Sequence, residues 1–134
     1  MYFQDETGAV LAEFVLVATI LLLLCMFCFE LAMILQAQLV LGTAAREGAR
    51  QAAVDGGWSS GVQQRVASLL QMGGLDNDHA QISVLPNQAA YGRPIDVSIE
   101  YTFNVRTAML RSVLPATIQL KSEVVTRSER LDER

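Results

Sequence analysis

The stretch that decides the fold is residues 14–35, FVLVATILLLLCMFCFELAMIL, in which Glu30 is the only charged residue. As a helix rising about 1.5 Å per residue, it reaches about 33 Å, enough to cross a hydrocarbon core of roughly 30 Å. It is longer than the roughly 7–15 apolar residues of a cleaved signal peptide, and no A-x-A site follows it. We therefore predict a membrane helix that stays in the mature protein.

Both cysteines, Cys25 and Cys28, lie inside this apolar run. Their spacing is formally C-x-x-C, but a thiolate in hydrocarbon has no cation to stabilise it. We expect these side chains to pack or to contact lipid, with no redox or metal role. The chain also has a single histidine, so no metal site or cofactor is predicted.

The helix is predicted to continue beyond the membrane run. No proline occurs up to Asp55, where Asp55-Gly56-Gly57 is a strong stop signal. One helix from about Ala9 to Val54 would be about 70 Å long. Small residues recur at helical spacing on one face, whereas charged and polar residues occupy the other. The first face holds Leu41, Ala44, Ala45, Gly48 and Ala52, and the second holds Arg46, Glu47, Arg50 and Gln51.

The sequence after Gly57 predicts a short helix followed by strands. Residues 95–105 alternate between apolar and polar six times, which indicates a strand buried on one face. Such strands need a cover, and the small-residue face of the long helix is available. The predicted fold is α+β: a long N-terminal helix with a transmembrane first half, a short second helix, and a three-stranded antiparallel sheet packed on the helix. The other predicted elements are a helix at 61–72 capped by Ser59 or Ser60, strands at 81–85 and 117–125, a turn at 108–113 and a fraying tail at 126–134.

The residues just before the apolar run resemble a type IV prepilin processing site. They read Gly8-Ala9-Val10-Leu11-Ala12-Glu13-Phe14. The resemblance implies cleavage between Gly8 and Ala9 by a prepilin peptidase, and glycine suits an extended, closely approached backbone. Glu13 would be the fifth mature residue. A carboxylate deep in a bilayer costs about 2.5–3.5 kcal/mol on insertion scales, so it needs a partner. In the pilin family that partner is a free N-terminal amine.

A second segment, Ala44-Ala45-Arg46-Glu47-Gly48-Ala49-Arg50, resembles the segment typical of TadE-like proteins. With the later strands, the resemblance covers about residues 8–128. It implies a minor pilin of a tight-adherence (Flp) pilus, either TadE or TadF, with roles in pilus assembly, adhesion and biofilm growth. The implied parts are a leader at 1–8, a transmembrane helix at 9–41 and an extracytoplasmic domain at 42–134. The implied location is the inner membrane, with the domain periplasmic or extracellular. Implied partners are other minor and major pilins in a TadE/TadF-type heteromer, the peptidase, the inner-membrane assembly platform and membrane lipid.

Several charged residues are candidates for partner contact or helix register besides Glu13. Glu30 either pairs with a base or polar group on a neighbouring helix or reaches out to the membrane interface. Arg46, Glu47 and Arg50 either bind a partner subunit or form ion pairs within a solvated face.

Composition narrows the remaining classes of function. After residue 41 the chain carries ten acids and ten bases, so no basic face for nucleic acid is expected. No nucleophile set, metal cluster or phosphate loop occurs, so we expect no enzyme. The alternative is an unprocessed, membrane-anchored binding or sensory domain. Basic residues after the span would by the positive-inside rule place the domain in the cytoplasm, whereas the resemblance places it outside.

Overall fold

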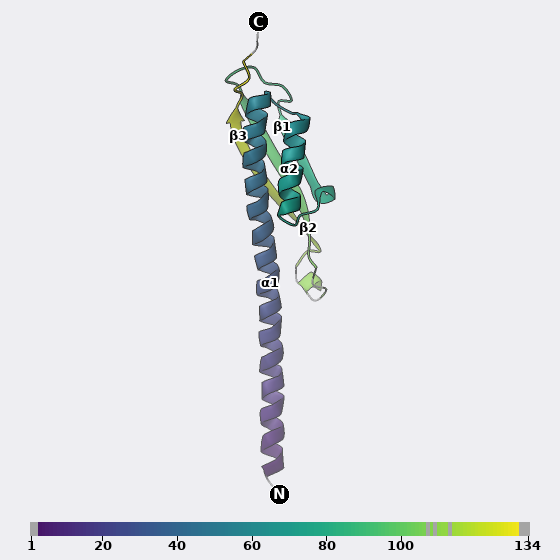
Figure 1. Cartoon of the computed structure of the whole chain (residues 1–134). Helices are drawn as coiled ribbons and strands as arrows, with labels where there is room; N and C mark the ends of the chain where they lie inside the picture. Colours follow the sequence, from purple (N-terminus) through teal and green to yellow (C-terminus); the bar gives the residue numbers. More distant parts are fainter. Residues whose placement is uncertain (1–2, 107, 109, 113, 132–134) are drawn as a thin grey trace.

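The computed structural model describes residues 3–106, 108, 110–112 and 114–131 and has the predicted α+β architecture. A very long helix runs the length of the molecule, and the rest of the chain packs beside its second half (Figure 1). The N- and C-terminal ends lie at opposite ends of the molecule. The elements are α1 (Phe3–Asp55), α2 (Ser60–Met72), a 3-10 turn η1 (Asn77–His79), β1 (Ala80–Leu85), β2 (Pro94–Asn104), a 3-10 turn η2 (Leu110–Ser112) and β3 (Thr117–Arg127).

Helix α1 begins earlier than the sequence predicted. It starts at Phe3 rather than at Ala9, and Gly8 lies within it. The prediction was wrong because one glycine costs a helix only about 1 kcal/mol relative to alanine, which good helix formers on both sides outweigh. The predicted end is confirmed: α1 ends at Asp55, before Gly56 and Gly57, both of which have positive φ. A helix of 53 residues is about 80 Å long.

The sheet is antiparallel with β2 in the centre, in the order β1-β2-β3. Tyr101 of β2 pairs with Ala80 on one side and Leu120 on the other. The apolar residues of the predicted alternation are all buried, and the polar residues between them are exposed or half-buried. The buried set is Ile95, Val97, Ile99, Tyr101, Phe103 and Val105.

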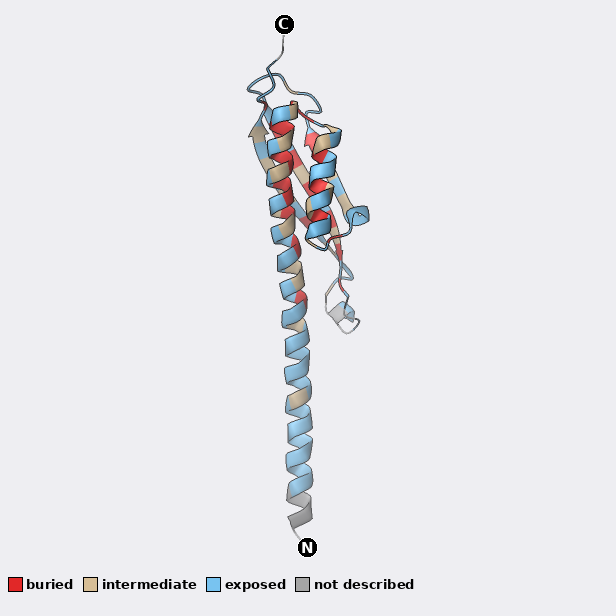
Figure 2. Cartoon of the chain, viewed as in Figure 1, coloured by how far each residue is buried: buried red, intermediate tan, exposed pale blue. Residues whose placement is uncertain are grey.

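Helices α1 and α2 lie side by side over one face of the sheet, and buried residues line their facing sides (Figure 2). The small-residue face of α1 makes this close approach possible. A Cβ atom on Gly48 would lie 2.7 Å from Val66 of α2 and 3.7 Å from Val97 of β2. Gly48 therefore lies where three elements meet. Ser59 caps α2 by accepting a hydrogen bond from the backbone N–H of Val62, as predicted.

Loops close the end of the domain that lies farthest from the apolar half of α1. The N–H of Trp58 donates to the carbonyl of Asn87, and the N–H of Ala89 donates to the carbonyl of Gly56. At Gly57, φ is +139°, and an added Cβ would lie 2.1 Å from the Asn87 carbonyl oxygen. Only glycine fits this contact between two backbones.

The segment after β3 is tied down up to Glu129, so the prediction that the tail frays from Thr126 was wrong. Thr126 and Arg127 belong to β3. Ser128 is buried and its hydroxyl donates to the carbonyl of Ala89, while the N–H of Glu129 donates to the carbonyl of Ala53. The bond from Glu129 satisfies a backbone carbonyl in the last turn of α1, which the sequence pattern could not reveal. Residues 132–134 of the predicted tail lie outside the described residues.

Candidate functional site

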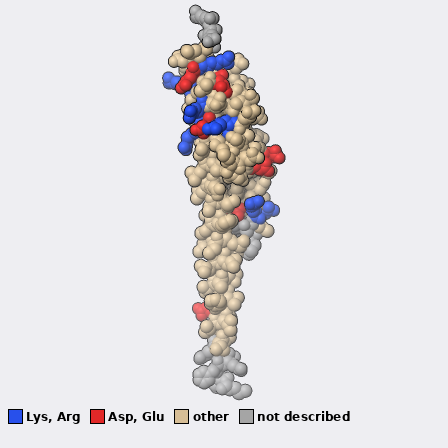
Figure 3. All heavy atoms as spheres, in the orientation of Figure 1, with Lys and Arg blue, Asp and Glu red and all other residues tan. Residues whose placement is uncertain are grey.

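The first half of α1 has no buried residue among its described side chains and is covered with exposed apolar side chains. From Val10 to Phe29 these cover a length of about 30 Å, the thickness of a hydrocarbon core. Beyond Glu30, Leu31, Leu35 and Leu39 are also exposed, on the side of α1 that faces away from the domain core. Charged side chains gather on the globular part, whereas the lower helix is almost bare of charge (Figure 3). Cys25 and Cys28 are exposed on this surface. This helix is long and apolar enough to span a membrane.

The four residues of the predicted processing site lie together near the lower end of α1. Gly8, Ala9, Glu13 and Phe14 are all helical and exposed, and nothing lies within 4 Å of where a Gly8 side chain would be. The extended backbone expected at Gly8 is not present, because the helix runs through it. Glu13 lies three residues beyond Val10, at the edge of the apolar surface.

Glu30 has a partner within its own chain. Its side chain is only 3 % exposed, and its Oε1 atom accepts a hydrogen bond of 3.0 Å from the backbone N–H of Arg106. From the sequence we expected either a group on a neighbouring helix or the membrane interface, and that expectation stays a prediction. Within this chain the carboxylate holds the connection between β2 and β3 against α1. Glu30 is the first buried residue among the described side chains of α1, and it lies inside the predicted 9–41 membrane segment.

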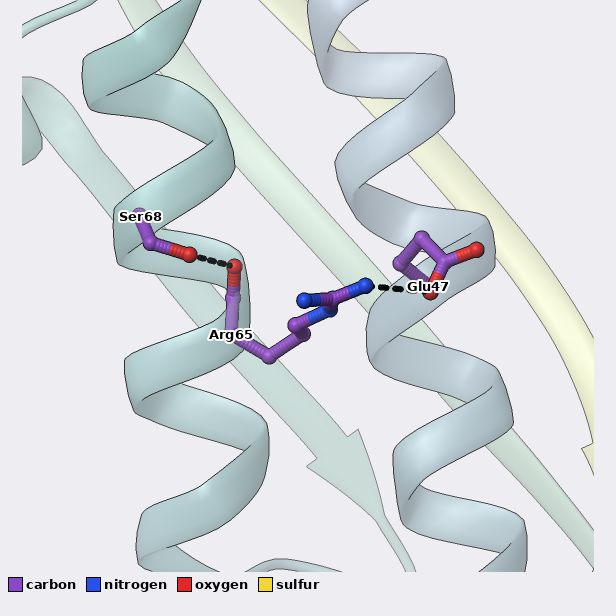
Figure 4. A network of polar contacts seen from close by, with 3 residues as sticks. All are labelled: Glu47, Arg65 and Ser68. Carbon is purple, nitrogen blue, oxygen red and sulfur yellow. Dashed lines mark hydrogen bonds and ion pairs between the residues drawn. The ribbon is translucent and has the colours of Figure 1, made fainter.

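Glu47 lies between the two helices and forms an ion pair with Arg65 of α2 at 3.3 Å (Figure 4). The Ser68 hydroxyl donates to the carbonyl of Arg65. The Arg65 and Glu47 side chains are 54 % and 33 % exposed, so this pair contributes at most about 1 kcal/mol. Glu47 therefore links α2 to α1 rather than pairing along one helix face.

Arg46 and Arg50 are exposed on the other side of α1, toward β3. They line a groove of about 560 Å³ between α1 and β3. Apolar residues of α1 and β3 also line it, and Glu129 is the acid in its lining. The two arginines thus lie on the β3 side of α1 and Glu47 on the α2 side, although the three are close in sequence. In the same segment, Ala44, Ala45, Gly48 and Ala49 are buried in the core.

A pocket of about 350 Å³ opens just above Glu30, where α1, the end of α2 and the end of β2 meet. Gln36, Asn104 and Arg106 line it with hydrogen-bond donors. Its other lining residues are Met33, Ala37, Gly73, Gly74, Leu75, Asp76, His79, Tyr101 and Phe103. His79 and Tyr101 form an edge-to-face pair with ring centroids 6.4 Å apart.

The structure thus separates the candidate residues into four places: the lower end of α1, the Glu30 contact, the interhelical pair and the β3 groove. Sequence reasoning missed the partners Arg106 and Arg65, since they lie 76 and 18 residues from the acids that they bind. Neither the helical nor the strand periodicity of a sequence relates residues that are so far apart. In the described part of the chain, no three His, Cys, Asp or Glu side chains gather at a metal-binding distance.

One comparison with known proteins finds a match. Residues 8–50 match the family model described as TadE-like protein. The match covers the processing segment, the apolar run and the segment from Ala44 to Arg50, all on α1. The sheet lies outside it, so the match is narrower than the resemblance to residue 128 predicted from the sequence. Neither the curated proteins nor the solved structures compared with the chain include a match.

Proposed function

We propose that this TadE-like chain, a protein associated with the Tad pilus system, is a minor pilin-like subunit that is processed by prepilin peptidase and helps to assemble, prime or cap the pilus. One observation carries the proposal. The first half of α1 is exposed and apolar on all sides over the thickness of a bilayer, while the second half carries a folded domain. Such a helix can lie in lipid first and then pack against other helices.

The mechanism follows from the environment of each half. In the inner membrane, lipid covers the apolar half. During assembly, the apolar halves of sister subunits replace the lipid, and the domains stay outside the bilayer. An unpaired Glu13 would place a carboxylate in hydrocarbon, which is unfavourable. Pairing of Glu13 with an N-terminal amine removes this cost, and it is possible only at one position of the helix along the axis of the bundle. This role is structural and not enzymatic.

The partners are other minor and major pilins, including a TadE/TadF-type heteromer, and the inner-membrane assembly platform. Arg46 and Arg50 are exposed beside an open groove, which supports contact between this side of α1 and an acidic patch of a partner. Adhesion and biofilm growth would follow from the pilus, with the domain on the periplasmic or extracellular side.

The first test is the N-terminus of the mature protein. Mass spectrometry of the chain purified from cells with an active prepilin peptidase should find Ala9 at the N-terminus. The same cells without the peptidase should yield a chain that still carries Gly8 and the residues before it. An uncut N-terminal segment in both strains would contradict the proposal and favour an unprocessed membrane-anchored binding domain.

A second test separates processing from assembly. Glu13→Ala should leave cleavage intact and reduce the number of pili by about tenfold or more, because the amine of the neighbouring subunit loses a charged partner worth about 1.5–3 kcal/mol. Electron microscopy of surface pili gives the count. Thr19→Ala is the matched control, since the Thr19 hydroxyl already donates to the carbonyl of Val15 within α1. Normal piliation in Glu13→Ala would remove this residue from the mechanism.

A further inference from the structure

We infer that the pocket above Glu30 binds the headgroup of an anionic phospholipid from the bilayer that α1 spans. The inference rests on the proposed membrane insertion of α1. The polar residues that line this pocket are Gln36, Asn104, Arg106, Asp76 and His79. The proposed pilin-like role does not require such a pocket.

The pocket lies just above the fully lipid-accessible part of α1. Up to Phe29 no described side chain of α1 is buried, and Glu30 is the first buried residue. If the hydrocarbon core covers the segment from Val10 to Phe29, its upper boundary lies at Glu30. Met33 and Ala37 line the pocket and lie about 5–10 Å farther along the helix. The polar layer on each side of the core is roughly 5–8 Å thick, so the pocket opens where lipid phosphates lie.

The polar side chains that line the pocket suit a phosphate headgroup. Arg106 provides a guanidinium, which binds phosphate with charge-assisted and bidentate hydrogen bonds. Gln36 and Asn104 add amide groups, which suit the hydroxyls of a glycerol headgroup. Among the apolar lining residues, Met33 is half-buried, whereas Ala37 and Phe103 are buried. Asp76 is the acid in the pocket, and its Oδ1 atom accepts a hydrogen bond from the N–H of Asp78.

Arg106 is held in position through its backbone, which leaves its side chain available. Its backbone N–H donates to buried Glu30, which fixes the start of the β2–β3 connection at this height. Its side chain is exposed, and no ion pair joins it to an acid among the described residues. Arg111 lies on the same connection, and its Nε atom donates to the carbonyl of Val105. The Arg106 side chain is thus held at the rim of the pocket with its guanidinium open to an incoming phosphate.

The test uses the full chain in nanodiscs that contain equal amounts of phosphatidylglycerol and phosphatidylcholine. Native mass spectrometry counts the lipids that stay bound after the protein leaves the nanodisc. We expect the wild-type chain to retain phosphatidylglycerol about tenfold more than phosphatidylcholine. Arg106→Gln should reduce this preference to about one, since it removes the charge and keeps the Glu30 hydrogen bond, which is made by the backbone. Circular dichroism checks that the variant is folded.

The matched control is Arg127→Gln, an exposed arginine at the far end of β3. Its preference should equal that of the wild type. Equal preference in all three proteins would overturn the inference. Displacement of the lipid by inorganic phosphate at constant ionic strength would also overturn it, because the site would then take a free anion. If Arg106→Gln retained the lipid but lost bound pilus subunits, the pocket would be a protein interface.

A separate measurement keeps this inference distinct from the proposed function. Extraction of cell membranes with alkaline carbonate should leave the chain in the membrane pellet. Release of the chain would contradict membrane insertion, and with it the proposed function. A chain that stays in the pellet but shows no preference for phosphatidylglycerol would contradict only the inference about the pocket.

Discussion

Replacing Gly48 with leucine should separate α2 and the sheet from α1 and cost the domain about 3 kcal/mol or more, at the upper end of overpacking effects. Even a single added carbon would lie 2.7 Å from Val66, which is completely buried and has a stiff, branched side chain. Val97 approaches from the sheet, so Val66 has little room to move. Thermal unfolding of the full chain in detergent, followed by circular dichroism, measures the loss.

Gly42→Ala is the control for this prediction. A Cβ at Gly42 would meet only the Arg46 guanidinium, at an ordinary 3.7 Å. Alanine is the better helix former by about 1 kcal/mol, so this variant should be as stable as the wild type or slightly more stable. If Gly48→Leu unfolds at the same temperature as Gly42→Ala, then Gly48 is not a close contact between the three elements.

Replacing Gly57 with alanine should open the loops at the far end of the domain and cost about 3 kcal/mol. Backbone angles reserved for glycine cost about 1–3 kcal/mol in other residues. In addition, the new Cβ would collide with the Asn87 carbonyl, which accepts the hydrogen bond of Trp58. Trp58 is the only tryptophan in the chain, so its fluorescence reports on this loop directly. We expect its emission to shift to longer wavelength and unfolding to occur at a lower temperature.

Gly92→Ala separates the two causes. Gly92 also has positive φ, at +75°, but nothing lies within 4 Å of an added Cβ. This variant should cost only about 1–2 kcal/mol, the penalty for a left-handed backbone. If Gly57→Ala is as stable as Gly92→Ala, then the collision with Asn87 is relieved at little cost in free energy.

The elements with a repeating pattern could be predicted from the sequence, and the contacts between distant residues could not. The alternation from Ile95 to Val105 identified the central strand and its buried face. Helical spacing identified the buried stripe from Leu41 to Ala52 on α1. Both rest on local geometry, in which the period of the backbone decides which side chains share a face.

Neither the β2–β3 connection beside Glu30 nor the ion pair between Glu47 and Arg65 could be predicted from the sequence. These contacts depend on where the strands and α2 lie in space, and they arise from single residues without a repeat. The segment from Ala44 to Arg50 shows both cases. Ala44, Ala45 and Gly48 were expected on a packing face, and they are buried there, as is Ala49, which was not predicted. The partner of its acid was found only in the structure.

The continuity of α1 has a mechanical consequence. No hinge separates the lipid-facing half from the half that carries the sheet, so the two halves turn and rise as one rod. One residue inserted between Phe14 and Phe29 would rotate the domain by about 100° around the helix axis and lift it by about 1.5 Å. In a helical assembly, the direction in which the domain faces around the helix axis therefore depends on the number of residues in the apolar half of α1.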